Sequence, residues 1–141
     1  MRARIPNQIR VQVMARANYR CEYCQLPAID YLLRLHVDHI RSLKHEGSSS
    51  IENLACCCPD CNANKGTDQG TFLNGPGSFT RFFNPRIDRW SDHFEAFEGA
   101  LYPKTPIAEA TIKILQLNDP DRVIIRQELA IDGRWPVTSL P

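Results

Sequence analysis

Two Cys-x-x-Cys pairs constrain this chain more than any other feature of its sequence. The pairs are Cys21 with Cys24 and Cys58 with Cys61, and 33 residues lie between Cys24 and Cys58. Four thiolates at this spacing favour one Zn²⁺ in a closed tetrahedral site, which leaves no open position for a substrate. We therefore expect a structural zinc centre that contributes on the order of 10 kcal/mol to folding. In zinc ribbons about 15–20 residues separate the pairs, so the longer segment here has room for a hairpin.

The composition is typical of one soluble globular domain, or of a small domain with an extension. The chain has 141 residues, of which 43% are hydrophobic and 23% charged. It contains no apolar run of about 18 residues, and its N-terminus has no apolar segment of a signal peptide. Because the cysteines are also paired at metal-ligand spacing, we expect a metal site in a reducing, cytoplasmic environment and not disulfide bonds.

Positive charge is concentrated in the first half of the chain. Residues 1–66 carry nine Lys or Arg against six Asp or Glu, whereas residues 67–141 carry eight against ten. The first twenty residues hold five Arg and no acid. Arg10, Arg16 and Arg20 are therefore candidates for contacts with nucleic-acid phosphates. A solvated helix face would account for the same run of charge equally well.

Hydrophobic periodicity predicts the order strand, loop, strand, helix between the cysteine pairs and just beyond them. The preceding segment, residues 7–18, has apolar residues at four-residue spacing and is expected to be a helix. Strands are expected at residues 33–41 and 53–57, with a loop over residues 42–50. A further helix is expected from Pro59 to about Lys65.

The remainder of the chain is expected to form an α/β extension ending in two helices. Residues 66–78 hold four of the seven glycines and are expected to be a linker or long loop. Residues 79–84 and 93–102 have strand-like patterns, although a helical face fits the second segment as well. Thr105-Pro106 and Asp119-Pro120 each place an N-cap residue before proline at the first helical position, which predicts helices to about residues 117 and 130.

Hard ligands and a base stand between the cysteine pairs. Asp38 offers a carboxylate and Asn62 an amide oxygen, and Mg²⁺ accepts both ligand types. His39 directly follows Asp38, so on a strand the two side chains point to opposite faces unless the strand is twisted or bulged. A single histidine on a strand is more often structural than catalytic. Cys56 and Cys57 are left over and are expected to be small buried apolar residues.

Three segments stand at fixed spacings: His36-x-Asp38-His39-Ile40, Asn53-Leu54 and Cys58-x-x-Cys61-Asn62-x-x-Lys65-Gly66. Together they resemble the HNH nuclease motif of the ββα-metal type, in the form that binds zinc through four cysteines. The motif covers roughly residues 16–66. The resemblance implies an α+β fold with a small zinc-stapled ββα core at residues 1–70 and an extension at residues 71–141 that packs on it.

The resemblance also implies roles for individual residues. It makes His39 the general base, Asp38 a ligand of a catalytic divalent ion, and Asn53 a residue that helps to hold the base and its loop. The last motif position is often His and is Asn62 here, which favours Mg²⁺ or Mn²⁺ over Ni²⁺ or Zn²⁺ at the catalytic position. Further candidates near the site are His36, Lys65 and Arg41. Structural roles fit His36 and Lys65 equally well.

The function that the resemblance implies is a metal-dependent endonuclease acting on DNA, with RNA as an alternative substrate. A zinc-stapled nucleic-acid-binding module without activity is the competing hypothesis, because it needs only the four cysteines and the basic N-terminal region. The joint presence of Asp38, His39, Asn53 and Asn62 favours the nuclease. The segment Phe82 to Phe94 also resembles a segment that follows the motif in a group of short bacterial HNH proteins.

Overall fold

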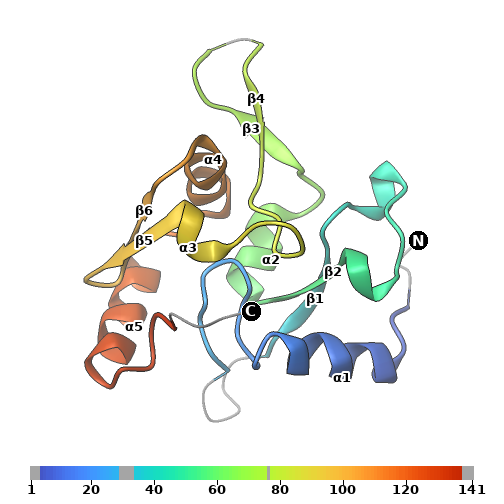
Figure 1. The fold of residues 1–141 in the computed structure, drawn as a ribbon, viewed down its shortest axis with the longest axis horizontal. Coiled ribbons are helices and arrows are strands. Elements are labelled where there is room, and N and C mark those ends of the chain that lie inside the picture. Colours follow the sequence, from blue (N-terminus) through green and yellow to red (C-terminus); the bar gives the residue numbers. More distant parts are fainter. Residues whose placement is uncertain (1–3, 29–33, 76, 138–141) are drawn as a thin grey trace.

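The computed structural model describes residues 4–28, 34–75 and 77–137, which form five helices and three two-stranded antiparallel sheets (Figure 1). The helices are α1 (Asn7–Arg16), α2 (Pro59–Lys65), α3 (Trp90–His93), α4 (Pro106–Leu115) and α5 (Pro120–Ile131). The strands are β1 (His36–His39), β2 (Leu54–Cys57), β3 (Gly70–Phe72), β4 (Phe79–Arg81), β5 (Phe94–Phe97) and β6 (Ala100–Pro103). The mixed helix and strand content confirms the expected α+β fold. In the described part of the chain, no helix is both long and apolar enough to cross a membrane.

The strands β1 and β2 and the helix α2 form the expected strand, loop, strand, helix unit. In the β1–β2 ladder, His36 stands opposite Cys57 and His39 opposite Leu54. All four residues of β2 are buried, so this strand lies in the interior and is not the half-exposed strand of an open sheet. The helix α2 begins at Pro59, and the Cys58 side chain accepts a hydrogen bond at its N-terminus. The first cysteine of the second pair therefore also caps the helix that carries the last one.

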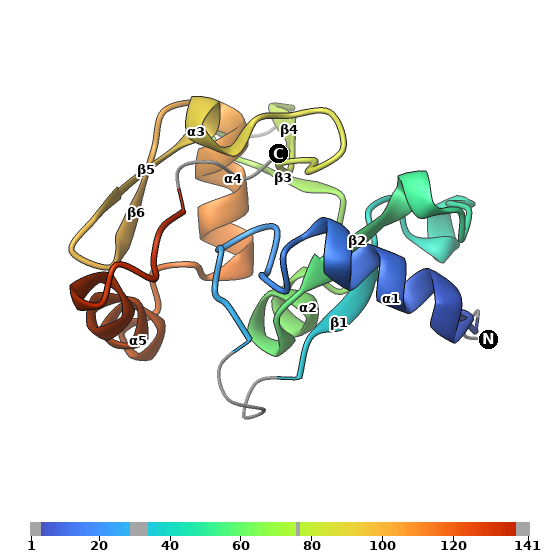
Figure 2. The same cartoon turned by 60° about the horizontal axis from the view of Figure 1, so that its bottom comes forward.

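The helix α1 runs beside the β1–β2 hairpin, as Figures 1 and 2 both show. Val13 is fully buried at this contact, in a cluster with Ala17, Leu54 and Cys56. Burying a side chain of this size stabilises the fold by about 1.5–3 kcal/mol. The helix ends at Arg16, two residues before the predicted end, and delivers the chain to the first cysteine pair.

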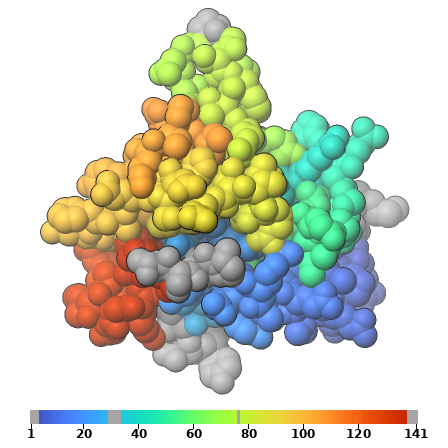
Figure 3. All heavy atoms as spheres, viewed as in Figure 1, coloured from blue at the N-terminus to red at the C-terminus, as the bar shows by residue number. Residues whose placement is uncertain are grey.

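The expectation of a linker or long loop over residues 66–78 is wrong in part, because β3 lies inside it. The strand pairs with β4 to form a hairpin that projects from the body (Figures 1 and 3). Phe72 and Phe79 stand opposite each other with their rings 5.5 Å apart. Gly70 lies in a strand despite its low strand propensity, because a Cβ there would come within 2.3 Å of the Thr80 carbonyl oxygen. The boundary expected at residue 70 also falls in this strand.

The ambiguous segment at residues 93–102 proves to be a hairpin of β5 and β6, preceded by the single turn of α3. The two helices after it begin where their capping signals predict. The Thr105 side chain accepts from the Ala108 amide, and the Asp119 side chain accepts from the Asp121 amide. The loop expected over residues 42–50 contains one short 3₁₀ helix, Leu43–His45, and a second, Ile51–Asn53, precedes β2.

The first cysteine pair and the extension share one hydrophobic core. Cys21, Cys24 and Tyr23 lie in a buried cluster with Phe83 and Phe94 of the extension, and Leu115, Leu117 and Leu129 belong to the same cluster. The indole of Trp90 donates to the Tyr23 carbonyl at 2.9 Å. The segment after β4 therefore packs directly over the first cysteine pair.

Candidate active site

Four cysteines from the two predicted pairs come together in the core. The Sγ atoms of Cys21, Cys24, Cys58 and Cys61 all lie within 4.8 Å of one another, and all four side chains are buried. Backbone amides of Cys24 and Cys61 point at the first sulfur of their own pair, at 3.5 and 3.4 Å. This donor set and spacing are compatible with one tetrahedral Zn²⁺. None of the six cysteines, all of which lie in described segments, forms a disulfide.

The two remaining cysteines are buried, as expected. The Sγ of Cys56 contacts the Met14 sulfur at 3.3 Å, on the α1 side of β2. Cys57 is also fully buried, on the next position of the strand. Neither belongs to the group of four sulfur atoms that lie within 4.8 Å of one another.

His39 lies at the end of β1, half-buried, with its Nε2 3.0 Å from the Ser49 hydroxyl. Partial burial lowers the pKa of its imidazole, and the neighbouring Asp38 carboxylate offsets only part of that effect. A lowered pKa favours the neutral ring, which is the state that a general base requires. Ser49 lies in a loop expected from sequence, but no pattern in the run of three serines marked it as a partner of His39.

Asn53 holds the segment that follows His39. Its Nδ2 donates to the carbonyl oxygens of Arg41 and Ser48 at 2.9 and 2.7 Å, while its Oδ1 accepts from the Arg41 amide at 2.9 Å. Since Ser48 precedes the serine that contacts His39, this amide fixes the loop that orients the imidazole. Glycine is required at position 47 for the loop to lie this close to Arg41, because a Cβ there would lie 1.8 Å from the Arg41 carbonyl oxygen.

Asp38 faces away from that loop and into the interior, where it is 5% exposed. Its carboxylate accepts from the Tyr23 hydroxyl at 2.9 Å and lies 3.3 Å from the Lys65 ammonium. Burial raises the pKa of this carboxyl, although Lys65 and Tyr23 lower it in part. The side chains of Asp38 and His39 thus have separate partners in separate parts of the fold, as expected for neighbours on a strand.

Lys65 is only 2% exposed, so it is not a surface lysine of α2. Besides Asp38, its Nζ donates to the His39 carbonyl oxygen at 3.1 Å. The residue therefore connects the C-terminal end of α2 to the end of β1. Of the other candidates on these elements, Asn62 is half-buried in α2, and His36 is half-buried at the start of β1.

The N-terminal arginines have different surroundings. Arg10 is exposed on α1 and so accessible to a phosphate. Arg16 instead donates to the carbonyl oxygens of Ile51 and Leu54, and Arg20 donates to that of Gln25 at 2.9 Å. Burial lowers the pKa of both these guanidinium groups. Their hydrogen bonds give Arg16 and Arg20 structural roles beside the predicted one.

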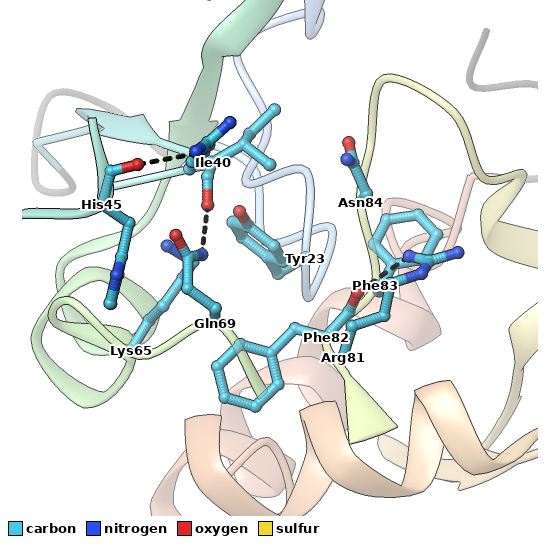
Figure 4. A pocket seen from close by; sticks show the side chains of 10 residues that line it. Tyr23, Ile40, His45, Lys65, Gln69, Arg81, Phe82, Phe83 and Asn84 are labelled. Atoms are coloured by element: carbon cyan, nitrogen blue, oxygen red, sulfur yellow. Dashed lines mark hydrogen bonds between the residues drawn. The ribbon is translucent and has the colours of Figure 1, made fainter. Parts of the chain in front are cut away.

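A cavity of about 330 Å³ opens next to Lys65 (Figure 4). Its wall is formed by the chain after β1, including Arg41 and His45, and by the segment from Arg81 to Asn84. Figure 4 shows Tyr23 between these two groups of side chains. Arg81 is held by Asp88 through two contacts of 2.8 and 3.0 Å, so its charge is compensated there. Arg41 is exposed, with its Nε donating to the His45 carbonyl oxygen at 2.7 Å.

The family model described as HNH endonuclease matches residues 21–68, from the first cysteine of the four-cysteine cluster to just beyond α2. This segment matches the HNH endonuclease domain. The matched HNH segment contains both cysteine pairs, His39, Asn53 and the Asp38–Lys65 pair, which confirms the family expected from the spacing of the motif.

A curated relative extends the similarity beyond the HNH segment. The chain is 25% identical over 118 residues to the Septu protein PtuB of Bacillus thuringiensis, an alignment that covers 82% of this chain and 43% of the relative. This chain therefore spans less than half the length of that relative. No solved structure matches the chain significantly.

Proposed function

We propose that this protein is an HNH endonuclease that hydrolyses DNA phosphodiester bonds, with His39 as the general base. The observation that carries the proposal is the setting of the His39 imidazole. The ring is half-buried, in contact with Ser49, and next to a loop held by three hydrogen bonds of Asn53, and its burial lowers the pKa of the imidazole. A histidine with only a structural role would not need a preorganised loop of this kind.

The chemistry assigned to His39 is proton transfer. The neutral imidazole takes a proton from the attacking water, whose oxygen bonds to phosphorus as the bond from phosphorus to the 3′-oxygen breaks, and the departing 3′-oxygen takes a proton from solvent. Burial supports this role, because it lowers the pKa of the imidazole and so favours the unprotonated ring. Asn53 acts as a positioning residue, and the exposed Arg41, two residues after His39, supplies positive charge beside the phosphate.

The predicted catalytic ion, Mg²⁺ or Mn²⁺ on Asp38 and Asn62, suits these donor types. The arrangement around Asp38, however, does not fit a bound ion. Its carboxylate is 5% exposed and already accepts from Tyr23 and Lys65, so an ion could bind only if Lys65 withdrew. Metal dependence is therefore proposed from the family resemblance, and no step of the mechanism is assigned to an ion.

The contact of Lys65 with the buried Asp38 carboxylate favours the second candidate, a zinc-stapled module that binds nucleic acid without cutting it. A lysine that occupies the place beside the predicted metal-binding carboxylate would suit such a module. The preorganised His39 loop favours the nuclease, since binding alone gives no reason for it.

Cleavage of supercoiled plasmid by the purified, zinc-loaded protein separates the two candidates. With Mg²⁺ or Mn²⁺ we expect nicked or linear DNA, and with neither ion no product. An RNA of the same sequence as one plasmid strand serves as the alternative substrate. A folded protein that contains zinc and retards DNA in a gel, yet leaves every substrate intact, would establish the binding module.

A further inference from the structure

Two buried arginines stand on the same face of α5, one turn apart, and the first of them contacts the four-cysteine cluster. Arg122 is 8% exposed and Arg126 is 1% exposed. Guanidinium groups are almost never buried to this extent without a compensating charge, because removing them from water costs several kcal/mol. These two buried side chains are therefore expected to have a compensating negative charge nearby.

Arg122 contacts the sulfur atoms directly. Its Nη2 lies 2.8 Å from the Cys61 Sγ and 3.7 Å from the Cys58 Sγ. Its Nη1 donates to the carbonyl oxygens of Leu115 and Gln116 at 2.7 and 3.1 Å. The planar group thus joins the end of α4 to the second cysteine pair.

Arg126 lies one turn after Arg122 on α5, and its partners are neutral groups. Its side chain donates to the carbonyl oxygens of Gly99 and Leu117 and lies over the Trp135 ring, 5.2 Å from the ring centre. The Trp135 indole in turn donates to the Cys24 carbonyl oxygen at 2.8 Å. The extension therefore reaches both cysteine pairs, one through Arg122 and the other through Trp135.

Carboxylates do not balance these charges. Among the described residues, the one carboxylate within ion-pair distance of either arginine is that of Asp60, 4.0 Å from the Arg122 Nε. The Asp60 side chain is 67% exposed, so water screens most of this attraction. The negative charge that two buried guanidinium groups require has to come from elsewhere.

The cysteine cluster supplies that charge when it holds zinc. Four thiolates around one Zn²⁺ have a net charge of about −2, and the Arg122 guanidinium lies against two of these sulfur atoms. We propose that Arg122 of the extension is a counter-charge of the zinc centre and raises zinc affinity by donating to the Cys61 and Cys58 thiolates. The extension is then part of the zinc centre, and zinc binding is coupled to the docking of α5 on the HNH segment.

This inference depends on the proposed zinc centre and not on nuclease activity. Its test is the zinc dissociation constant, measured by competition with a chromophoric chelator, for the full chain and its Arg122→Gln variant. Loss of a partner that donates to a metal ligand typically weakens metal binding by about 10- to 100-fold, and we expect a change in that range. Arg134→Gln is the matched control, because it removes one exposed positive charge three residues after α5. We expect it to change zinc affinity less than about twofold.

A second measurement distinguishes a contact with sulfur from a purely structural role. In the cobalt-substituted protein, loss of a hydrogen bond to a thiolate moves the sulfur-to-cobalt charge-transfer band to lower energy. Arg122→Gln should show this shift while Arg134→Gln does not. Arg122→Lys, which keeps the charge without the planar fork, should show the shift with an intermediate zinc affinity, and it replaces Arg122→Gln if that variant does not fold.

Zinc affinity and band position equal to those of the Arg134→Gln control would overturn the inference. A wild-type protein that binds no zinc would instead refute the zinc centre itself. Absence of DNA cleavage, with the expected changes in zinc affinity, would refute the proposed function and leave this inference standing.

Discussion

The side-chain amide of Asn53 and the main chain of Arg41 exchange two hydrogen bonds of 2.9 Å each, and a third bond joins Asn53 to the Ser48 carbonyl oxygen. This amide therefore closes the loop between β1 and β2 around the position of His39. Asn53, the middle Asn of the motif, therefore acts on the main chain of Arg41, which lies two residues after the proposed base His39.

Replacing Asn53 by Ala should uncouple the loop from His39. Two carbonyls and one amide lose their partner, so we expect a stability loss of about 1–3 kcal/mol in urea unfolding. We expect kcat for cleavage to fall by a larger factor than KM rises, because the imidazole loses its orientation. Asn53→Asp, which keeps one acceptor and loses both donors, is the matched comparison. Cleavage at the wild-type rate in Asn53→Ala would show that the loop does not position the base.

The pH dependence of cleavage should report the His39 imidazole. A general base works in its deprotonated form, so the rate should rise with pH and level off once the ring is neutral. Because burial lowers the pKa of His39, the midpoint of the rise should lie below the ordinary value of 6.5. Initial rates between pH 4.5 and 8, at constant ionic strength, measure it. A rate that does not vary over the acid half of this range would argue against a histidine base.

The Asp38–Lys65 pair should behave as a buried ion pair. Either single replacement, Asp38→Asn or Lys65→Met, leaves the partner unpaired in the interior, and we expect each to cost about 3–5 kcal/mol of stability. The double variant should recover much of that loss, so the two effects should not add in a double-mutant cycle. Urea unfolding of the four proteins measures the coupling. Additive losses would mean that Asp38 has a different partner, such as a metal ion.

The run Cys56-Cys57-Cys58 provides a control within three residues for the zinc centre. Cys58→Ala should remove bound zinc and much of the stability, since metal binding supplies on the order of 10 kcal/mol in such sites. Cys56→Ala should retain one zinc per chain, because the Cys56 sulfur faces Met14 and not the cluster. Metal analysis of both purified variants makes the comparison. Zinc loss in Cys56→Ala, or zinc retention in Cys58→Ala, would contradict the assignment of ligands.

Much of the HNH segment, and the starts of the last two helices of the extension, could be predicted because their signals are local. The Cys-x-x-Cys spacing fixes the ligand set, alternation around Asp38 predicts the strand, and proline after Thr105 or Asp119 marks a helix start. These features depend on a few neighbouring residues, so the sequence alone carries them.

Most of the contacts that the sequence did not predict join distant segments. Arg122 reaches Cys61 across 61 positions, Trp135 reaches Cys24 across 111, and Tyr23 reaches Asp38 across 15. An arginine in an amphipathic helix is ordinarily a solvated residue, and nothing in its neighbours marks it as buried. The burial of Lys65 escaped prediction for the same reason, since its partner Asp38 lies on another element.

The most direct test of the account is plasmid cleavage by His39→Ala beside His45→Ala, with zinc content and unfolding measured for both. His45 lies in the same loop region with an exposed side chain. The two histidines therefore differ in the contact with Ser49, which His39 makes. We expect His39→Ala to keep its zinc and fold and to lose cleavage by at least about 100-fold, while His45→Ala retains it within a few-fold. Cleavage by His39→Ala at the wild-type rate would show that His39 is not the general base.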